Sequence, residues 1–119
     1  MPIQLTRAQF EDAVADALDS IPQDLFDRLD NVAITVEDEP EPGSSPGLLG
    51  LYVGVPLTRR DSGYGLGNIP DHIYIFRGPL TRYCNSRPQL LEQIRVTVLH
   101  EIGHYFGMSD ARLHELGWG

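Results

Sequence analysis

The segment from Ser86 to Phe106 constrains the fold of this chain most, because it is apolar on nearly every side of a helix yet carries His100, Glu101 and His104 near its end. Ser86-Arg87-Pro88-Gln89 has the form of a helix start, with a capping serine and a proline in the first turn. The apolar residues that follow predict a long, buried helix: Leu90, Leu91, Ile94, Val98, Leu99, Ile102, Tyr105 and Phe106. A buried polar group without a partner costs about 2–7 kcal/mol, so the three polar side chains need partners, and a metal ion would supply one.

The polar residues form the pattern His100-Glu101-Ile102-Gly103-His104. On a helix, His100 and His104 lie one turn apart on one face, so both imidazoles can reach one cation. Glu101 is displaced by roughly 60° from His104 around the helix axis. It can therefore hydrogen-bond a water on the metal without being a ligand itself.

Asp110 is the expected third ligand. Gly107 offers a left-handed end to the helix, which turns the chain back towards the histidines. Two alternatives stay open. Ser109 or Asp110 could instead cap a short helix that contains Leu113 and Leu116, and His114 could be a substitute ligand.

The residue types suit hydrolysis by zinc. Catalytic zinc has three protein ligands and a water, whereas structural zinc is closed by four protein ligands. Such an ion lowers the pKa of its bound water to roughly 7. Glu101 would then act as general base towards the water and as general acid towards the leaving amine.

Several segments, in this order along the chain, resemble the small bacterial zincin-like metallopeptidases. They are Asn31–Ile34 with the acidic Glu37–Pro40, Leu48–Thr58, Pro70–Phe76 and His100–Asp110. The resemblance implies a minimal zincin fold with one Zn²⁺ on His100, His104 and Asp110. It also implies a peptide or protein substrate, whose identity it does not define.

The chain departs from the larger metzincins at two points. Asp110 stands where those proteins have a third histidine, and no methionine follows it to form the turn below the metal; Met108 lies inside the motif. The lower half of the usual substrate cleft is therefore expected to be missing. A non-catalytic metal-binding or regulatory module, or hydrolysis of a non-protein amide, are the alternatives to a peptidase.

Composition limits the other functions. The 119 residues predict a single domain over 1–119. A net charge of −8 and a pI near 4.7 disfavour nucleic acid as a partner. The absence of an 18-residue apolar run predicts no membrane span. An acidic, amphipathic start without a signal peptide and a single cysteine, Cys84, together favour the cytoplasm.

The remaining pattern predicts an α+β fold. It comprises a helix over about Arg7–Leu18 and, after Pro22, a short helix with Leu25, Phe26 and Leu29 facing inward. Three strands are expected at Val32–Val36, Leu51–Val55 and His72–Phe76, forming a small mixed sheet packed against the first helix and the motif helix. A short helix should end the chain.

The loop Thr58–Pro70 carries further candidates for substrate contacts. Arg59 or Arg60 could hold a substrate carboxylate, and Tyr64 could hydrogen-bond an oxyanion; solvated loop residues are the alternative. An extended peptide would pair with an exposed edge of the sheet. The sequence indicates neither which strand forms that edge nor the oligomeric state.

Overall fold

A computed structural model describes residues 4–45, 47–54 and 71–119. Its elements follow in the order α1 (Arg7–Asp19), α2 (Gln23–Phe26), β1 (Val32–Glu37), β2 (Gly50–Val53), β3 (Asp71–Phe76), α3 (Arg77–Tyr83), α4 (Arg87–Tyr105) and α5 (Asp110–Glu115). Each helix within the described residues is too short or too polar to cross a membrane.

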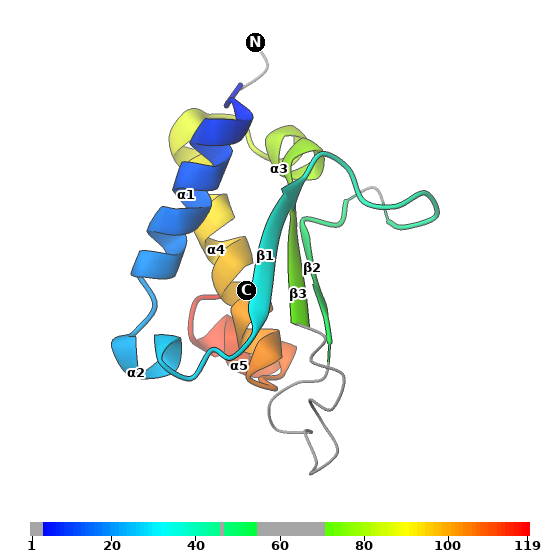
Figure 1. Ribbon diagram of the computed structural model, residues 1–119. Helices are drawn as coiled ribbons and strands as arrows, with labels where there is room; N and C mark the ends of the chain where they lie inside the picture. The colour runs from blue at the N-terminus through cyan, green and yellow to red at the C-terminus, as the bar shows by residue number, and fades with distance from the viewer. Residues whose placement is uncertain (1–3, 46, 55–70) are drawn as a thin grey trace.

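The three strands form one mixed sheet in the order β1-β3-β2. β1 runs parallel to β3, and β2 runs antiparallel to it. Helices α1 and α4 cover one face of the sheet, α3 follows directly after β3 at one end, and α5 lies at the other end (Figure 1). The expected α+β fold with a small mixed sheet is confirmed.

The core lies between the sheet and the two long helices. Ile73 and Ile75 of β3 are fully buried, as are Phe10 of α1 and Ile94 of α4. On the opposite face of β3, the ring of His72 stacks on that of Tyr74 at a centroid distance of 4.2 Å. The alternation along β3 therefore directs every second side chain towards α4.

Local sequence signals explain where the long helices begin. The Thr6 hydroxyl accepts a hydrogen bond from the Gln9 backbone N–H, and the Gln9 side-chain oxygen accepts one from the Thr6 backbone N–H. The two bonds complete the expected capping box of α1. Ser86 caps α4 in the same way by accepting from the Gln89 N–H. Both helix starts thus match the predictions.

Two local expectations were wrong, and one helix was not predicted. Phe26 at the end of α2 is 44% exposed, since the inner face of this segment is formed by Leu25 and Leu29, four residues apart, which pack against the core. Leu91 lies on the outer side of α4 and is 41% exposed. Helix α3 was not predicted, because it begins without a side-chain cap and contains Gly78-Pro79, a pair more typical of a turn.

Candidate metal centre

The last turn of α4 brings the two motif histidines together. Nε2 of His100 lies 3.0 Å from Nε2 of His104, and the two rings are nearly perpendicular at 88°. Both side chains are partly exposed, at 27% and 33%. The histidine pair is therefore accessible at the surface, whereas the rest of the turn is buried.

The chain then turns back so that Asp110 faces the pair. Gly107 ends α4 with a φ of 80°, the left-handed conformation that glycine adopts at least cost. The Asp110 Oδ1 atom lies 3.6 Å from His104 Nε2 and 3.9 Å from His100 Nε2. Ser109 caps α5 by accepting from the Arg112 N–H, so the Asp110 carboxylate is not needed as the cap.

These three atoms fit a zinc ion. Their separations of 3.0, 3.6 and 3.9 Å place a point equidistant from all three at roughly 2 Å from each, and zinc lies about 2.0–2.2 Å from histidine nitrogen and carboxylate oxygen. The donor set is two imidazoles and one carboxylate, which is also a common zinc set. The three separations are therefore compatible with donors around one zinc ion.

The protonation of the rings agrees with this fit. His100 Nδ1 lies 3.0 Å from the Trp118 backbone oxygen, which can only accept, so Nδ1 is the donor in this hydrogen bond, and a ring with that single proton offers a lone pair at Nε2. The His104 ring donates to the Met108 backbone, and since its Nε2 faces His100, Nδ1 makes that bond. Burial, then the charge of His100, lowers the pKa of His104, while Asp110 and Met108 oppose the shift. The two Nε2 atoms lie 3.0 Å apart, and with both rings protonated at Nδ1 they would direct their lone pairs towards a cation bound between them.

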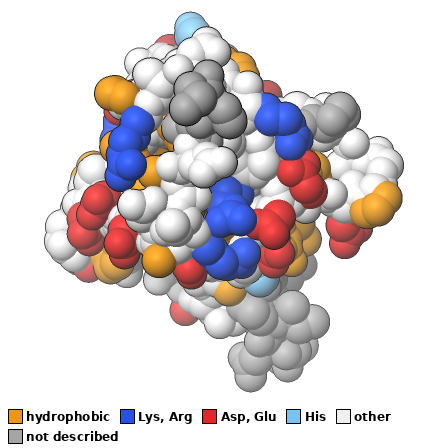
Figure 2. Space-filling model, turned by 90° about the horizontal axis from the view of Figure 1, so that it is seen from above, with side chains coloured by type: hydrophobic (Ala, Val, Ile, Leu, Met, Phe, Trp, Pro, Cys, Tyr) orange, Lys and Arg blue, Asp and Glu red, His pale blue; other side chains and the backbone are white. Residues whose placement is uncertain are grey.

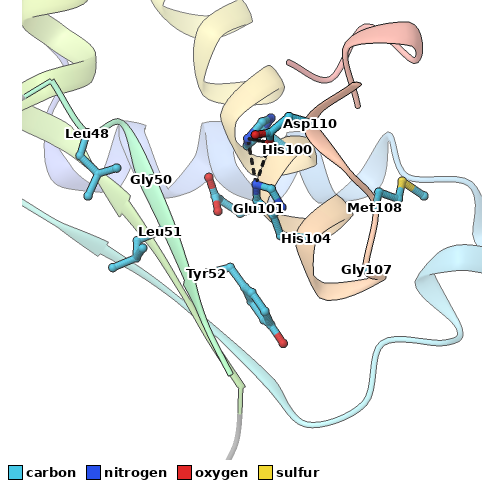
Figure 3. Close-up of a pocket in the computed structure, with 10 residues that line it drawn as sticks. All are labelled: Leu48, Gly50, Leu51, Tyr52, His100, Glu101, His104, Gly107, Met108 and Asp110. Carbon is cyan, nitrogen blue, oxygen red and sulfur yellow. Dashed lines mark hydrogen bonds and ion pairs between the residues drawn. The ribbon is translucent and has the colours of Figure 1, made fainter. Parts of the chain in front are cut away.

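Glu101 lies beside the pair and faces β2 (Figure 3). It is only 6% exposed. Burial raises its pKa to about 7; a hydrogen bond from the Tyr52 backbone lowers the pKa, and the negative charge of Asp110 adds to the rise. Its carboxylate and the two histidine nitrogens lie within 4.8 Å of one another, so these residues form a group that could bind a metal.

The site opens into a pocket of about 550 Å³ between β2, the end of α4 and the start of α5. Its lining residues are Leu48, Gly50, Leu51, Tyr52, His100, Glu101, His104, Gly107, Met108 and Asp110 (Figure 3). The Tyr52 hydroxyl points away from the histidines and donates to Asp71 Oδ2 at 2.6 Å. One wall of the pocket is therefore the strand β2, and its other wall is the turn that carries His100 and His104.

Gly50 allows β2 to approach α4 at this point. A Cβ at position 50 would lie 2.8 Å from Thr97 Cγ2 and 3.2 Å from Glu101 Cγ, both on α4. This close approach brings the Tyr52 backbone within hydrogen-bond distance of the Glu101 carboxylate. Neither Gly50 nor Tyr52 was predicted from the sequence to be part of the site.

Comparison with known proteins agrees with the motif. The model of the zincin-like metallopeptidase family matches residues 29–118. The chain belongs to this family. A solved structure, a conserved hypothetical protein from Thermus thermophilus, matches with a TM-score of 0.58 and 24% identity over 94% of this chain and 97% of that one. At that identity the likeness shows the zincin-like fold alone. No curated protein matches the chain.

Other residues predicted for the site of this zincin-like chain are not placed beside His100 and His104 by the described residues. Arg59, Arg60 and Tyr64, with the rest of the loop Thr58–Pro70, lie outside the described residues. His114 is on the exposed side of α5 and belongs to no group of potential metal ligands within the described part of the chain. The described candidates that the fold brings together are therefore His100, Glu101, His104 and Asp110.

A second pocket, of about 690 Å³, lies at the far end of the zincin-like domain between α1 and α3. Figure 2 views this end and shows basic and acidic side chains next to one another. Arg82 makes two hydrogen bonds of 2.9 Å to Glu39, and Arg77 lies 3.1 Å from Asp38. These charges neutralise each other, so the pocket presents neither a cationic nor an anionic site.

Proposed function

We propose that the protein is a zinc-dependent peptidase, with His100, His104 and Asp110 as zinc ligands and Glu101 as the general base. The observation that carries the proposal is the convergence of three ligand atoms at the mouth of an open pocket, beside a buried carboxylate. Membership of the zincin-like metallopeptidase family supports it.

The residues around the site have separable tasks. A zinc ion held here would acidify a bound water and polarise the carbonyl of the scissile bond. The Glu101 carboxylate accepts a proton from the attacking water and later donates it to the leaving amine. The Tyr52 backbone holds that carboxylate in place.

The edge strand β2 provides a binding surface for an extended peptide. Among the described strands, β2 pairs with β3 alone, so its other edge has no strand beside it. Gly50, Leu51 and Tyr52 of this strand line the pocket. A substrate chain would add to this edge by backbone hydrogen bonds and present its scissile bond to Glu101.

One observation favours a non-catalytic metal site as a second candidate. Glu101 lies within 4.8 Å of both histidine nitrogens, so a small movement would allow it to become a fourth protein ligand beside Asp110. A site closed by four protein ligands is typical of structural zinc. In that case Glu101 would be a zinc ligand and not the general base.

Glu101→Gln separates the two candidates. For a peptidase, the variant should keep its zinc affinity and lose roughly 10²–10⁴-fold in turnover of a peptide library, because an amide accepts no proton. If the site is structural, the variant should lose zinc while the parent shows no turnover. A parent that cleaves only a panel of cell-wall amides would identify a non-protein substrate, and a variant as fast as the parent would exclude Glu101 as the base.

A further inference from the structure

Both ends of the segment that contains α5 lie next to His100. Asp110 at the start of the helix lies 3.9 Å from Nε2 of His100, and the Trp118 carbonyl oxygen beyond its end lies 3.0 Å from Nδ1 of that ring. The segment 110–118 therefore reaches both nitrogens of one imidazole. The two contacts require the chain to reverse direction after α5.

Gly117 makes that reversal. It has a φ of +77°, which strains any residue with a Cβ and strains β-branched residues most. The Gly117 N–H donates to the His114 carbonyl at 3.1 Å, and the Trp118 N–H donates to the Leu113 carbonyl at 2.8 Å. This pair of hydrogen bonds is the Schellman motif that ends helices at a left-handed glycine. The conformation at Gly117 thus determines where the Trp118 carbonyl points.

Packing holds the reversed chain against α4. Leu113 is fully buried, and Trp118 is partly buried against the hydrophobic core. Gly119 lies over the imidazole, since a Cβ at that position would be 3.3 Å from His100 Nδ1. The carbonyl contact is therefore part of a packed arrangement and does not depend on a single hydrogen bond.

We propose that the turn formed by Gly117 and Trp118 positions His100 for metal binding, by fixing the ring in the tautomer whose Nε2 carries no proton. This inference rests on the proposed metal site and not on peptidase activity. A carbonyl oxygen accepts only, so it selects the Nδ1–H form; the opposite tautomer would direct an N–H towards the metal position and block it. Loss of a hydrogen-bond partner of a metal-ligating histidine typically lowers the metal affinity by about 10–100-fold.

The test compares variants at position 117 that differ in their tolerance of a positive φ. Gly117→Val should displace the Trp118 carbonyl, whereas Gly117→Asn should keep it, because asparagine adopts the left-handed conformation far more readily. Arg112→Ala, on the exposed side of the same helix, is the matched control. Trp118→Ala and Trp118→Phe form a second pair that alters the packing and leaves Gly117 intact.

Two quantities are measured for each variant. Long-range ¹H–¹⁵N NMR of the metal-free protein under mildly alkaline conditions identifies the protonated ring nitrogen of His100, assigned by the loss of its signals in His100→Ala. Competition with a chelator gives the zinc dissociation constant. The NMR readout requires neither zinc nor turnover, so it tests this inference even if the protein cleaves no peptide.

The expected result is an Nδ1–H tautomer in the wild type, Gly117→Asn, Trp118→Phe and Arg112→Ala. Gly117→Val and Trp118→Ala should show increased Nε2–H and bind zinc about 10–100-fold more weakly. An Nε2–H tautomer in the folded wild type would overturn the proposal. A Trp118→Ala variant with the tautomer and the zinc affinity of the wild type would also overturn it. This variant therefore tests the proposal even if Gly117→Val does not fold.

Discussion

Leu113 on α5 occupies the space that a side chain at Gly103 on α4 would need, since a Cβ at position 103 would lie 2.1 Å from Leu113 Cδ2. Leu113 is fully buried at this contact. Because α5 begins at Asp110, the close packing of the two helices also holds the carboxylate beside the histidines. The glycine inside the motif is thus a docking position for α5.

Gly103→Ala should therefore weaken the metal site without changing a ligand. The added methyl group must push Leu113 outward, which should lower the free energy of unfolding by about 1–3 kcal/mol, as is typical of overpacking. Displacement of α5 should also raise the zinc dissociation constant. Urea unfolding and chelator competition measure the two effects.

Leu113→Ala provides the control for that interpretation. Alone it should cost about 2–5 kcal/mol as a large-to-small core substitution, but together with Gly103→Ala it makes room for the new methyl group. The double variant should lose less stability than the sum of the single losses. Additive losses would mean that the two positions do not compete for the same space.

Ser109 and Asp110 should separate capping from metal binding. Ser109→Ala removes the cap of α5 and should cost about 0.5–2 kcal/mol of stability while zinc affinity changes little. Asp110→Asn should leave the metal-free protein nearly as stable and weaken zinc binding severely, whereas Asp110→His should retain zinc. Calorimetric zinc titration checks this, and an Asn variant with wild-type affinity would exclude Asp110 as a ligand.

Gly50→Ala should impair turnover more than zinc binding. The new Cβ would lie 2.8 Å from Thr97 Cγ2, so β2 must move away from α4 and from the Glu101 carboxylate that its backbone holds. Thr97→Ser removes that methyl group and should partly restore turnover in the double variant; Thr97→Ser alone is the control. Equal losses in kcat and zinc affinity would contradict a separate role for β2.

The sequence predicted the parts of the site that depend on neighbours along the chain. His100 and His104 share a face because of helical periodicity, and Gly107 at a φ of 80° allows Asp110 to return to them. The helix starts at Thr6 and Ser86 could be predicted for the same reason, since each capping side chain accepts a hydrogen bond from a residue three positions further along the chain.

The unpredicted parts depend on contacts between distant segments. Gly50 matters only because β2 packs against α4, and the Trp118 carbonyl matters only because α5 folds back across that helix. Phe26 was assigned to the core from its spacing, but Leu25 and Leu29, four residues apart, are the side chains of this segment that pack against the core, and Phe26 is exposed. No periodicity in one segment encodes such pairings.

The central claim is that His100 and His104 hold one divalent metal ion, and metal content tests it most directly. Mass spectrometry of protein purified with zinc should find one zinc ion per wild-type chain and none in the His100→Ala/His104→Ala variant. Zinc at about 100 times its dissociation constant should also stabilise the wild type by about 2.7 kcal/mol, through binding to the native state alone. Equal zinc content in the wild type and the double variant would contradict the account.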